Sequence, residues 1–317
     1  MKDFEIYSPE NTISQNLSEN TKRLLAITEQ EISHLYDLAY EIADGRDLQE
    51  ILLTLPDLFS VDVNSLLDVI PQNKDAVGRL HGVFSESRNL LLCYSVCELL
   101  RKRQPLTSEA FFADAPISFH ENPRIIYQKS GYADSAYLRF SSMFEESHAI
   151  YTHGFVSACE DVYNGLCEYC ILPVESSAEG LLGSFFKLIL KYDLKIAATC
   201  DVIEKRDHRT TRFALLRRTL LPIFSTASPN MAFELALTGC GAKEMANLLF
   251  AASFFGVELS NVVSLPSNDG RDNALVRLIF SLTNGDTEAF LMFLSMEFPQ
   301  YIPIGIYPHL SAKKERM

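Results

Sequence analysis

The sequence is short of basic residues. Lys and Arg together number 28 against 41 Asp and Glu, which gives a formal net charge of −13. A chain this acidic has no diffuse electrostatic attraction to phosphate backbones or anionic lipids. Nucleic-acid binding would need a local basic patch, and the one dense cluster, from Lys205 to Arg209, is better interpreted as a solvated turn. We therefore expect neither nucleic acid nor a membrane as a partner.

Long apolar runs and paired metal ligands are also missing. No stretch reaches the ~18 apolar residues of a membrane span, and Met1–Glu5 has no basic-then-apolar signal pattern. The seven cysteines are odd in number and lie mostly within apolar runs, which favours reduced thiols in a cytoplasmic protein. Cys167 and Cys170 form a lone CxxC without the second ligand pair that zinc needs. We expect no metal and no cofactor.

What is present is an ordinary globular composition. Apolar residues make up 47% and charged residues 22%, which excludes a disordered chain and a coiled-coil rod. The 317 residues are enough for two or three domains. Proline-containing segments at 105–123 and 222–229 are typical of linkers. They predict three domains, at 1–122, 123–225 and 230–312.

The first domain is predicted to be all-α. Apolar positions recur with a period close to 3.6 over 21–44, and a longer helix is predicted over 75–103. Between them, Asp47 can cap a short helix that ends at Leu55, before Pro56.

The second domain has an α/β pattern. Strand-like and helix-like segments alternate from Arg124, with strands expected at 124–127, 149–152, 169–174 and 194–202. Such alternation predicts a mostly parallel sheet with helices on its faces. Capping-box spacing at Ser157-Glu160 and again at Ser176-Glu179 predicts the starts of two of these helices.

The third domain follows a different order. Strands are expected at 231–238, 257–265, 274–282 and 302–307, with helices at 242–255 and 286–298. This βαββαβ order is that of an α+β ferredoxin-like domain. Such modules can pair through sheet edges or helices, so we expect a homodimer.

Three segments resemble, in the same order, the motifs of one enzyme family. The first, from Phe155 to Gly180, contains Glu160-Asp161-Val162, Glu168-Tyr169 and a run from Leu172 to Gly180 that reads LPVESSAEG. The others are Thr210-Thr211-Arg212-Phe213 and Gly305-Ile306-Tyr307-Pro308. Over roughly 124–310 the chain resembles prephenate dehydratase followed by an ACT regulatory domain. In bifunctional relatives a helical chorismate mutase precedes these parts, but the arginines that line its active site have no match in 21–44, and mutase activity is not favoured.

The resemblance implies a periplasmic-binding-protein-like α/β fold and a reaction. A dehydratase of this family converts prephenate, a dicarboxylate, to phenylpyruvate, water and carbon dioxide. Carried over to this chain, Thr211 is the catalytic acid and Arg212 anchors a substrate carboxylate, while Ser176, Ser177 and Gly131 contribute to substrate binding. Two alternatives stay open. Thr211 could simply begin a strand in which Arg212 pairs with an acidic residue, and the two serines could only cap a helix.

The departures from the family pattern put the activity in doubt. Ser176 stands where the family has Asn, and Tyr132 and Asp134 replace two hydroxyl residues after Gly131. Between the strand at 194–202 and Thr210 the family has a second α/β lobe, for which this chain has only 203–209. The Glu and Arg of the family's phenylalanine site are also absent, so a phenylalanine response is not expected. Dehydratase activity is therefore expected to be weak or lost, and the alternative is a non-catalytic protein that binds a small molecule or a partner.

Overall fold

The chain forms two compact units, Met1–Pro105 and Leu106–Met317, in a computed structural model. The structure describes residues 30, 32–59, 74–112, 122–203, 209–220, 230–265, 275–283 and 285–310. The basic cluster at 205–209 lies almost entirely outside the described residues, and so do residues 113–121 of the first predicted linker and all of the second, 222–229. Among the helices of the described ranges, none combines the length and apolar character needed to cross a membrane.

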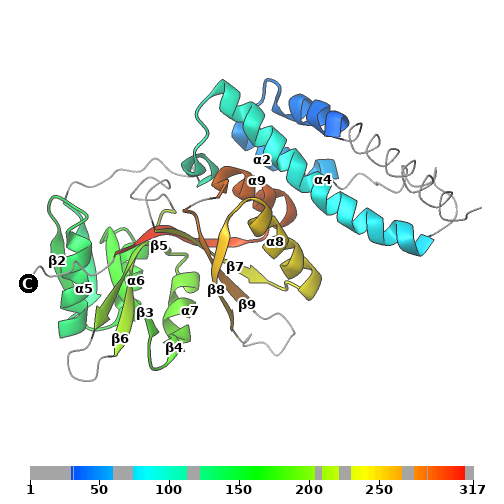
Figure 1. Cartoon of the computed structure of the whole chain (residues 1–317). Helices are drawn as coiled ribbons and strands as arrows, with labels where there is room; N and C mark the ends of the chain where they lie inside the picture. Colours follow the sequence, from blue (N-terminus) through cyan, green and yellow to red (C-terminus); the bar gives the residue numbers. More distant parts are fainter. Residues whose placement is uncertain are drawn as a thin grey trace, which may run out of the picture. The chain divides into compact units, whose positions relative to one another are not determined.

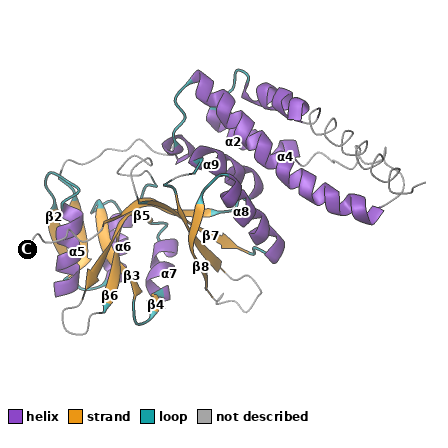
Figure 2. Cartoon of the chain, viewed as in Figure 1, coloured by secondary structure: helices purple, strands orange, loops and turns teal. Residues whose placement is uncertain are grey.

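The described elements of the first unit are all helical, whereas the strands belong to the second unit (Figure 2). Residues 32–43 are helical and are followed by α2 (Leu48–Phe59) and α4 (Lys74–Arg103). As predicted, Oδ1 of Asp47 accepts a hydrogen bond from the backbone N–H of Glu50, at 2.8 Å. The predicted end of this helix before Pro56 is wrong, because α2 continues for three residues beyond it. A proline near a helix end removes only one amide donor.

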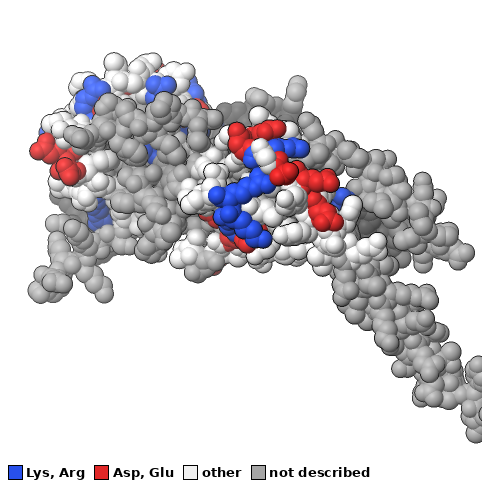
Figure 3. All heavy atoms as spheres, turned by 90° about the horizontal axis from the view of Figure 1, so that it is seen from above, with Lys and Arg blue, Asp and Glu red and all other residues white. Residues whose placement is uncertain are grey.

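Basic residues at the end of α4 have acidic neighbours within the same unit. Arg101 pairs with Glu98 at 2.9 Å, and Arg103 pairs with Asp44 at 3.4 Å. On the face shown in Figure 3, basic and acidic side chains likewise lie next to each other. Opposite charges placed in this way reduce the positive potential that an anionic partner would meet.

A ten-stranded sheet organises the second unit, in the order β2-β1-β3-β6-β5-β10-β7-β9-β8 with β4 paired to β3. The strands of its first half are β1 (Arg124–Gln128), β2 (His148–Thr152), β3 (Tyr169–Ser176), β4 (Gly180–Leu181), β5 (Lys195–Ile203) and β6 (Thr210–Arg217). Those of its second half are β7 (Met231–Thr238), β8 (Glu258–Leu265), β9 (Leu275–Ser281) and β10 (Ile302–Leu310). In Figure 1, β10 is red and lies between the green strands and the yellow and orange ones.

The first half of the sheet is mixed: the four strands expected from the sequence, β1, β2, β3 and β5, run in one direction, and β6 is inserted antiparallel between β3 and β5. Strand β1 is parallel to β2 and β3, but β6 is antiparallel to both of its neighbours, β3 and β5. The reason is that only a short segment connects β5 to β6. Ile203 at the end of β5 lies opposite Thr210 at the start of β6. A parallel crossover needs about a dozen residues or more, whereas a hairpin needs only a few.

Helices cover both faces of this half. Helices α6 (Phe155–Tyr163) and α7 (Gly183–Lys191) pack on a core that includes Leu172, Ala214 and Leu216. Helix α5 (Gly131–Ser141) packs on the opposite face, with Phe213 and Leu215. The alternation of β6 side chains between these two cores fixes which residues share a face.

Both predicted capping boxes are wrong. Helix α6 begins after Gly154, so Ser157 lies inside it, and α7 begins after Leu182. The segment from Ser176 to Gly180 is instead the turn that joins β3 to β4. Gly180 has φ +71° there, a left-handed conformation that suits glycine and reverses the chain. The serine that does cap a helix is Ser130, whose Oγ accepts from the N–H of Ala133 at 3.1 Å at the start of α5.

The second half of the sheet has the element order expected from the sequence. Strand β7 is followed by α8 (Ala242–Phe254), β8, β9, α9 (Thr287–Glu297) and β10. Its strands pair antiparallel in the order β10-β7-β9-β8, and a short 3-10 helix, η1 (Ser108–Phe112), contacts α9. Because β10 also pairs parallel with β5, the predicted domains 123–225 and 230–312 share one sheet. A boundary between them stays a prediction.

Candidate functional site

Two irregularities in the strands place acidic side chains beside Arg212. The register shifts between Pro173 and Glu175 in β3 and between Ile196 and Ala198 in β5. In a regular strand, Glu175 would share the face of Ile171, toward α5. The shift brings it opposite Arg212 instead. The shift in β5 likewise turns Asp201 away from the α5 core, which holds Cys200 and Val202.

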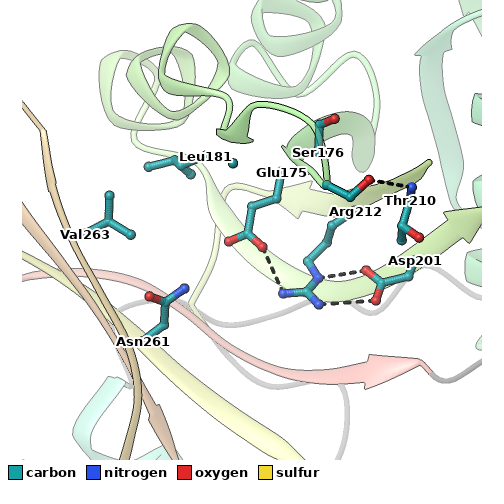
Figure 4. Close-up of a pocket in the computed structure, with 10 residues that line it drawn as sticks. Glu175, Ser176, Leu181, Asp201, Thr210, Arg212, Asn261 and Val263 are labelled. Atoms are coloured by element: carbon teal, nitrogen blue, oxygen red, sulfur yellow. Dashed lines mark hydrogen bonds and ion pairs between the residues drawn. The ribbon is translucent and has the colours of Figure 1, made fainter.

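The guanidinium of Arg212 is held by two carboxylates (Figure 4). Its Nε and Nη2 donate to Oδ1 and Oδ2 of Asp201 at 2.8 and 3.2 Å, and its Nη1 donates to Oε2 of Glu175 at 3.0 Å. The two bonds to Asp201 have the bidentate geometry that best matches a guanidinium to a carboxylate. Within the described residues, these contacts use three of the five N–H groups of the guanidinium.

Glu175 also joins this pair to a buried one. Its Oε1 accepts from Nη1 of Arg277 at 2.7 Å, and Arg277 donates from Nε and Nη2 to Glu234 at 2.6 and 3.0 Å. Glu234 is 0% exposed and also accepts from the hydroxyl of Tyr307. Buried charges are tolerated when they are paired and hydrogen-bonded. The network therefore connects β3 and β6 with β9, β7 and β10.

A pocket of about 330 Å³ opens above this network. It is lined by Glu175, Ser176, Ser177, Gly180, Leu181, Asp201, Thr210, Arg212, Asn261 and Val263. The first half of the sheet thus contributes the charged side chains, and the edge strand β8 contributes an amide and an apolar residue. In Figure 4, Asn261, Val263 and Leu181 lie on the side of Glu175 away from Asp201.

The structure brings only some of the predicted site residues together. Arg212, Ser176 and Ser177 line the pocket, but Thr211 and Gly131 do not. Thr211 alternates with Arg212 along β6 and so lies on the face of Phe213 and Leu215, where α5 packs. Gly131 is the first residue of α5 and is exposed. Thr211 and Arg212, adjacent in sequence, therefore point to opposite faces of the sheet, as in the alternative interpretation of a strand start.

The two serines hold the turn between β3 and β4. Oγ of Ser176 accepts from the N–H of Ala178 at 3.2 Å, and Oγ of Ser177 accepts from the N–H of Thr210 at 3.0 Å. The N–H of Ser177 in turn donates to the carbonyl of Thr210 at 2.8 Å. Since no helix begins at these serines, the alternative in which they cap a helix is wrong.

The pKa values of Asp201 and Arg212 are both shifted toward the charged form. Burial raises the pKa of Asp201, but hydrogen bonds from His309 and Arg212 outweigh burial and hold this pKa well below its usual range. The hydrogen bond to Asp201 raises the pKa of Arg212 further, against the effect of burial. A general acid or base works best with a pKa near the working pH. These shifts move both groups away from that range, which suits charge pairing rather than proton transfer.

A chain from Thr199 through His309 to Asp201 resembles a nucleophile, base and acid. Oγ1 of Thr199 lies 3.1 Å from Nδ1 of His309, and Nε2 of His309 lies 3.5 Å from Oδ2 of Asp201. An active nucleophile must reach its substrate. Thr199 is only 3% exposed and does not line the pocket, so this arrangement is a structural hydrogen-bond chain.

Of the residues that line the pocket, the sequence analysis predicted Arg212, Ser176 and Ser177. Its alternative, in which Arg212 pairs with an acidic residue, is confirmed by the ion pairs with Glu175 and Asp201. Sequence reasoning missed Asp201, Arg277 and Asn261. Asp201 reaches Arg212 only through a shift of register, and Arg277 lies 102 residues from Glu175. The one signal of the buried ion pair in the sequence was a single charged residue within an apolar strand, such as Glu234 or Arg277.

Cys167 and Cys170 are buried as free thiols. In the described part of the chain, no group of three or more His, Cys, Asp or Glu side chains is arranged to hold a metal ion.

Comparison with known proteins gives low similarity. No protein-family model matches the chain, and no characterised protein matches it in sequence. Among solved structures, the prephenate dehydratase from Streptococcus mutans is 17% identical over 60% of this chain and 100% of its own, with a TM-score of 0.46. The prephenate dehydratase from Arthrobacter aurescens in complex with L-Phe is 12% identical over 58% and 90%, with a TM-score of 0.45. GqqA, described as a novel type of quorum quenching acylase, is 20% identical over 58% and 94%, with a TM-score of 0.46.

Proposed function

We propose that the protein is a non-catalytic relative of prephenate dehydratases that binds a small molecule. The family assignment rests on the three sequence segments that resemble dehydratase and ACT motifs in the same order. The βαββαβ order of 231–310 supports an ACT-like part. The hairpin that joins β5 directly to β6 supports the loss of the second lobe.

The observation that carries the loss of catalysis is the position of Thr211 relative to Arg212. In the roles that the family resemblance implies, an acid and a carboxylate anchor act on one substrate, which requires both groups in one site. Here Thr211 lies on the α5 face, while the guanidinium of Arg212 faces the pocket and is occupied by Asp201 and Glu175. A dianionic substrate would compete with these carboxylates for the guanidinium and would be repelled by their charge.

Turnover of prephenate tests this proposal. Formation of phenylpyruvate, followed by its absorbance in alkali, should be equal for the wild-type protein, for Thr211→Ala and for a blank without protein. Robust turnover that Thr211→Ala abolishes would restore the dehydratase assignment. Circular dichroism of the variant controls for folding.

A further inference from the structure

The pocket above Arg212 has the size and lining of a small-molecule site. Its volume of about 330 Å³ falls at the lower end of the roughly 300–1,000 Å³ of ligand pockets. Leu181 and Val263 offer apolar contacts, while Glu175 and Asn261 offer oxygen acceptors nearby. This combination suits a ligand with one polar head and a short apolar body.

The charge of the lining favours a positive head group. Two carboxylates, Asp201 and Glu175, face one guanidinium, that of Arg212, which leaves one negative charge. The residues behind the lining do not remove this excess, because Arg277 is shared between Glu175 and Glu234. Counting those two residues as well, three carboxylates face two guanidinium groups within the described residues, and the imidazole of His309 lies 3.5 Å from Asp201.

An anion and a cation would meet this lining differently. A carboxylate ligand would find three of the five N–H groups of Arg212 already bonded and would meet the negative charge of Asp201 and Glu175, whose ion pairs with Arg212 lie at 2.8 and 3.0 Å. A cation breaks none of them. Each oxygen of Glu175 accepts one bond from an arginine, and a carboxylate offers about four lone-pair sites in all. An ammonium group can therefore bond to Glu175 while its existing ion pairs stay in place.

We propose that this pocket binds a small molecule that carries one primary ammonium group on a short apolar chain. The ammonium donates to Glu175 and to the amide oxygen of Asn261, and the apolar chain packs on Leu181 and Val263. This inference rests on the proposed function, since it names the ligand class of the same non-catalytic pocket.

Three compounds that share an isopentyl chain test the charge preference. Isopentylamine is a cation, leucine adds a carboxylate to it, and 4-methylpentanoate keeps only the carboxylate. Isothermal titration of the full-length protein should show millimolar binding of isopentylamine, weaker binding of leucine and binding of 4-methylpentanoate at least about tenfold weaker than that of the amine, a readily measured difference. Equal or tighter binding of the carboxylate, tighter binding of leucine than of the amine, or no binding of the amine would overturn the proposal.

A pair of variants locates the binding. Asn261→Lys places a tethered ammonium in the pocket, and isopentylamine binding should be lost. Ser264→Lys adds the same charge to an exposed position of the same strand, on the opposite face by strand alternation, and binding should be kept. Unchanged binding in Asn261→Lys, or equal loss in both variants, would contradict the site. The wild-type comparison of amine and carboxylate stands even where a variant fails to fold.

Different results would overturn the non-catalytic assignment and the ammonium ligand. Prephenate turnover would remove the non-catalytic assignment and with it this inference. Absence of turnover together with preferential binding of 4-methylpentanoate would remove only the ammonium ligand.

Discussion

Oε1 of Glu175 lies 2.7 Å from Nη1 of Arg277, although the two residues are 102 positions apart in the chain. The contact ties the end of β3 to β9 and so makes the pocket a joint product of both halves of the sheet. Glu175 is shared between Arg277 on one side and Arg212 on the other. The position of this pocket wall therefore depends on the buried pair of Arg277 and Glu234, neither of which lines the pocket.

The buried pair should be important for stability. Arg277→Met leaves Glu234 without its charge partner in the core, and we expect a loss of about 3–5 kcal/mol in the free energy of unfolding. Arg124→Met is the matched control, because Arg124 pairs with Glu168 at 2.7 Å on the surface and should cost about 0–1 kcal/mol. Urea denaturation measures both. Equal losses of unfolding free energy in the two variants would show that burial does not increase the contribution of the Arg277–Glu234 pair to stability.

Acid should weaken the protein through Asp201. The pKa of this group is lowered in the folded state from about 3.9 in an unfolded chain. Its contribution to stability is therefore present above about pH 4 and is lost as the pH falls below that value toward the folded pKa.

Urea unfolding at a series of pH values would show this contribution. Asp201→Asn should be less stable than the wild type at pH 7 and should lose less stability between about pH 4 and pH 2. Glu179→Gln, a change in the exposed turn between β3 and β4, is the control for a general loss of negative charge. Parallel pH profiles of wild type and Asp201→Asn would count against this role.

Two serines that look alike in sequence should respond differently to alanine. Ser130→Ala removes the side-chain bond to the N–H of Ala133 and should cost about 0.5–2 kcal/mol. Ser157 lies inside α6 and is exposed, so Ser157→Ala should change stability by no more than about 0.5 kcal/mol. Thermal unfolding of both variants tests the observed helix starts, and a larger loss in Ser157→Ala would favour the capping box instead.

Gly305 should be required where the two halves of the sheet meet. A Cβ at this position would come within 2.5 Å of the carbonyl oxygen of Ile196, and β10 would have to move away from β5. We expect Gly305→Ala to cost about 1–3 kcal/mol. Gly131→Ala is the control, since a Cβ there meets nothing within 4 Å. A neutral Gly305→Ala would mean that β5 and β10 are not closely paired.

The sequence predicted local structure better than tertiary arrangement. The apolar pattern predicted a strand at 231–238, and β7 has these bounds. Glycine commonly follows a helix end, and Gly165, with φ +74°, follows the end of α6. Periodicity could not show that β6 turns back beside β5, because strand direction depends on pairing. The spacing of Ser176 and Glu179 suits a helix start as well as a turn, and the positive φ of Gly180 decides for the turn.

The site was predicted less well than the fold, for a related reason. A motif such as Thr211-Arg212 names two adjacent residues, but a strand sends adjacent side chains to opposite faces. Only the positions of α5 and of the pocket show which face each one meets. Asp201 became visible as a partner only once the register shift in β5 was known.

The most direct test of the account is calorimetric titration of prephenate into the full-length protein. Asp201 and Glu175 occupy the guanidinium of Arg212, and the account therefore predicts no saturable binding at millimolar prephenate. Saturable binding that Arg212→Gln abolishes would show that the guanidinium is available to a dianion, and would contradict the account.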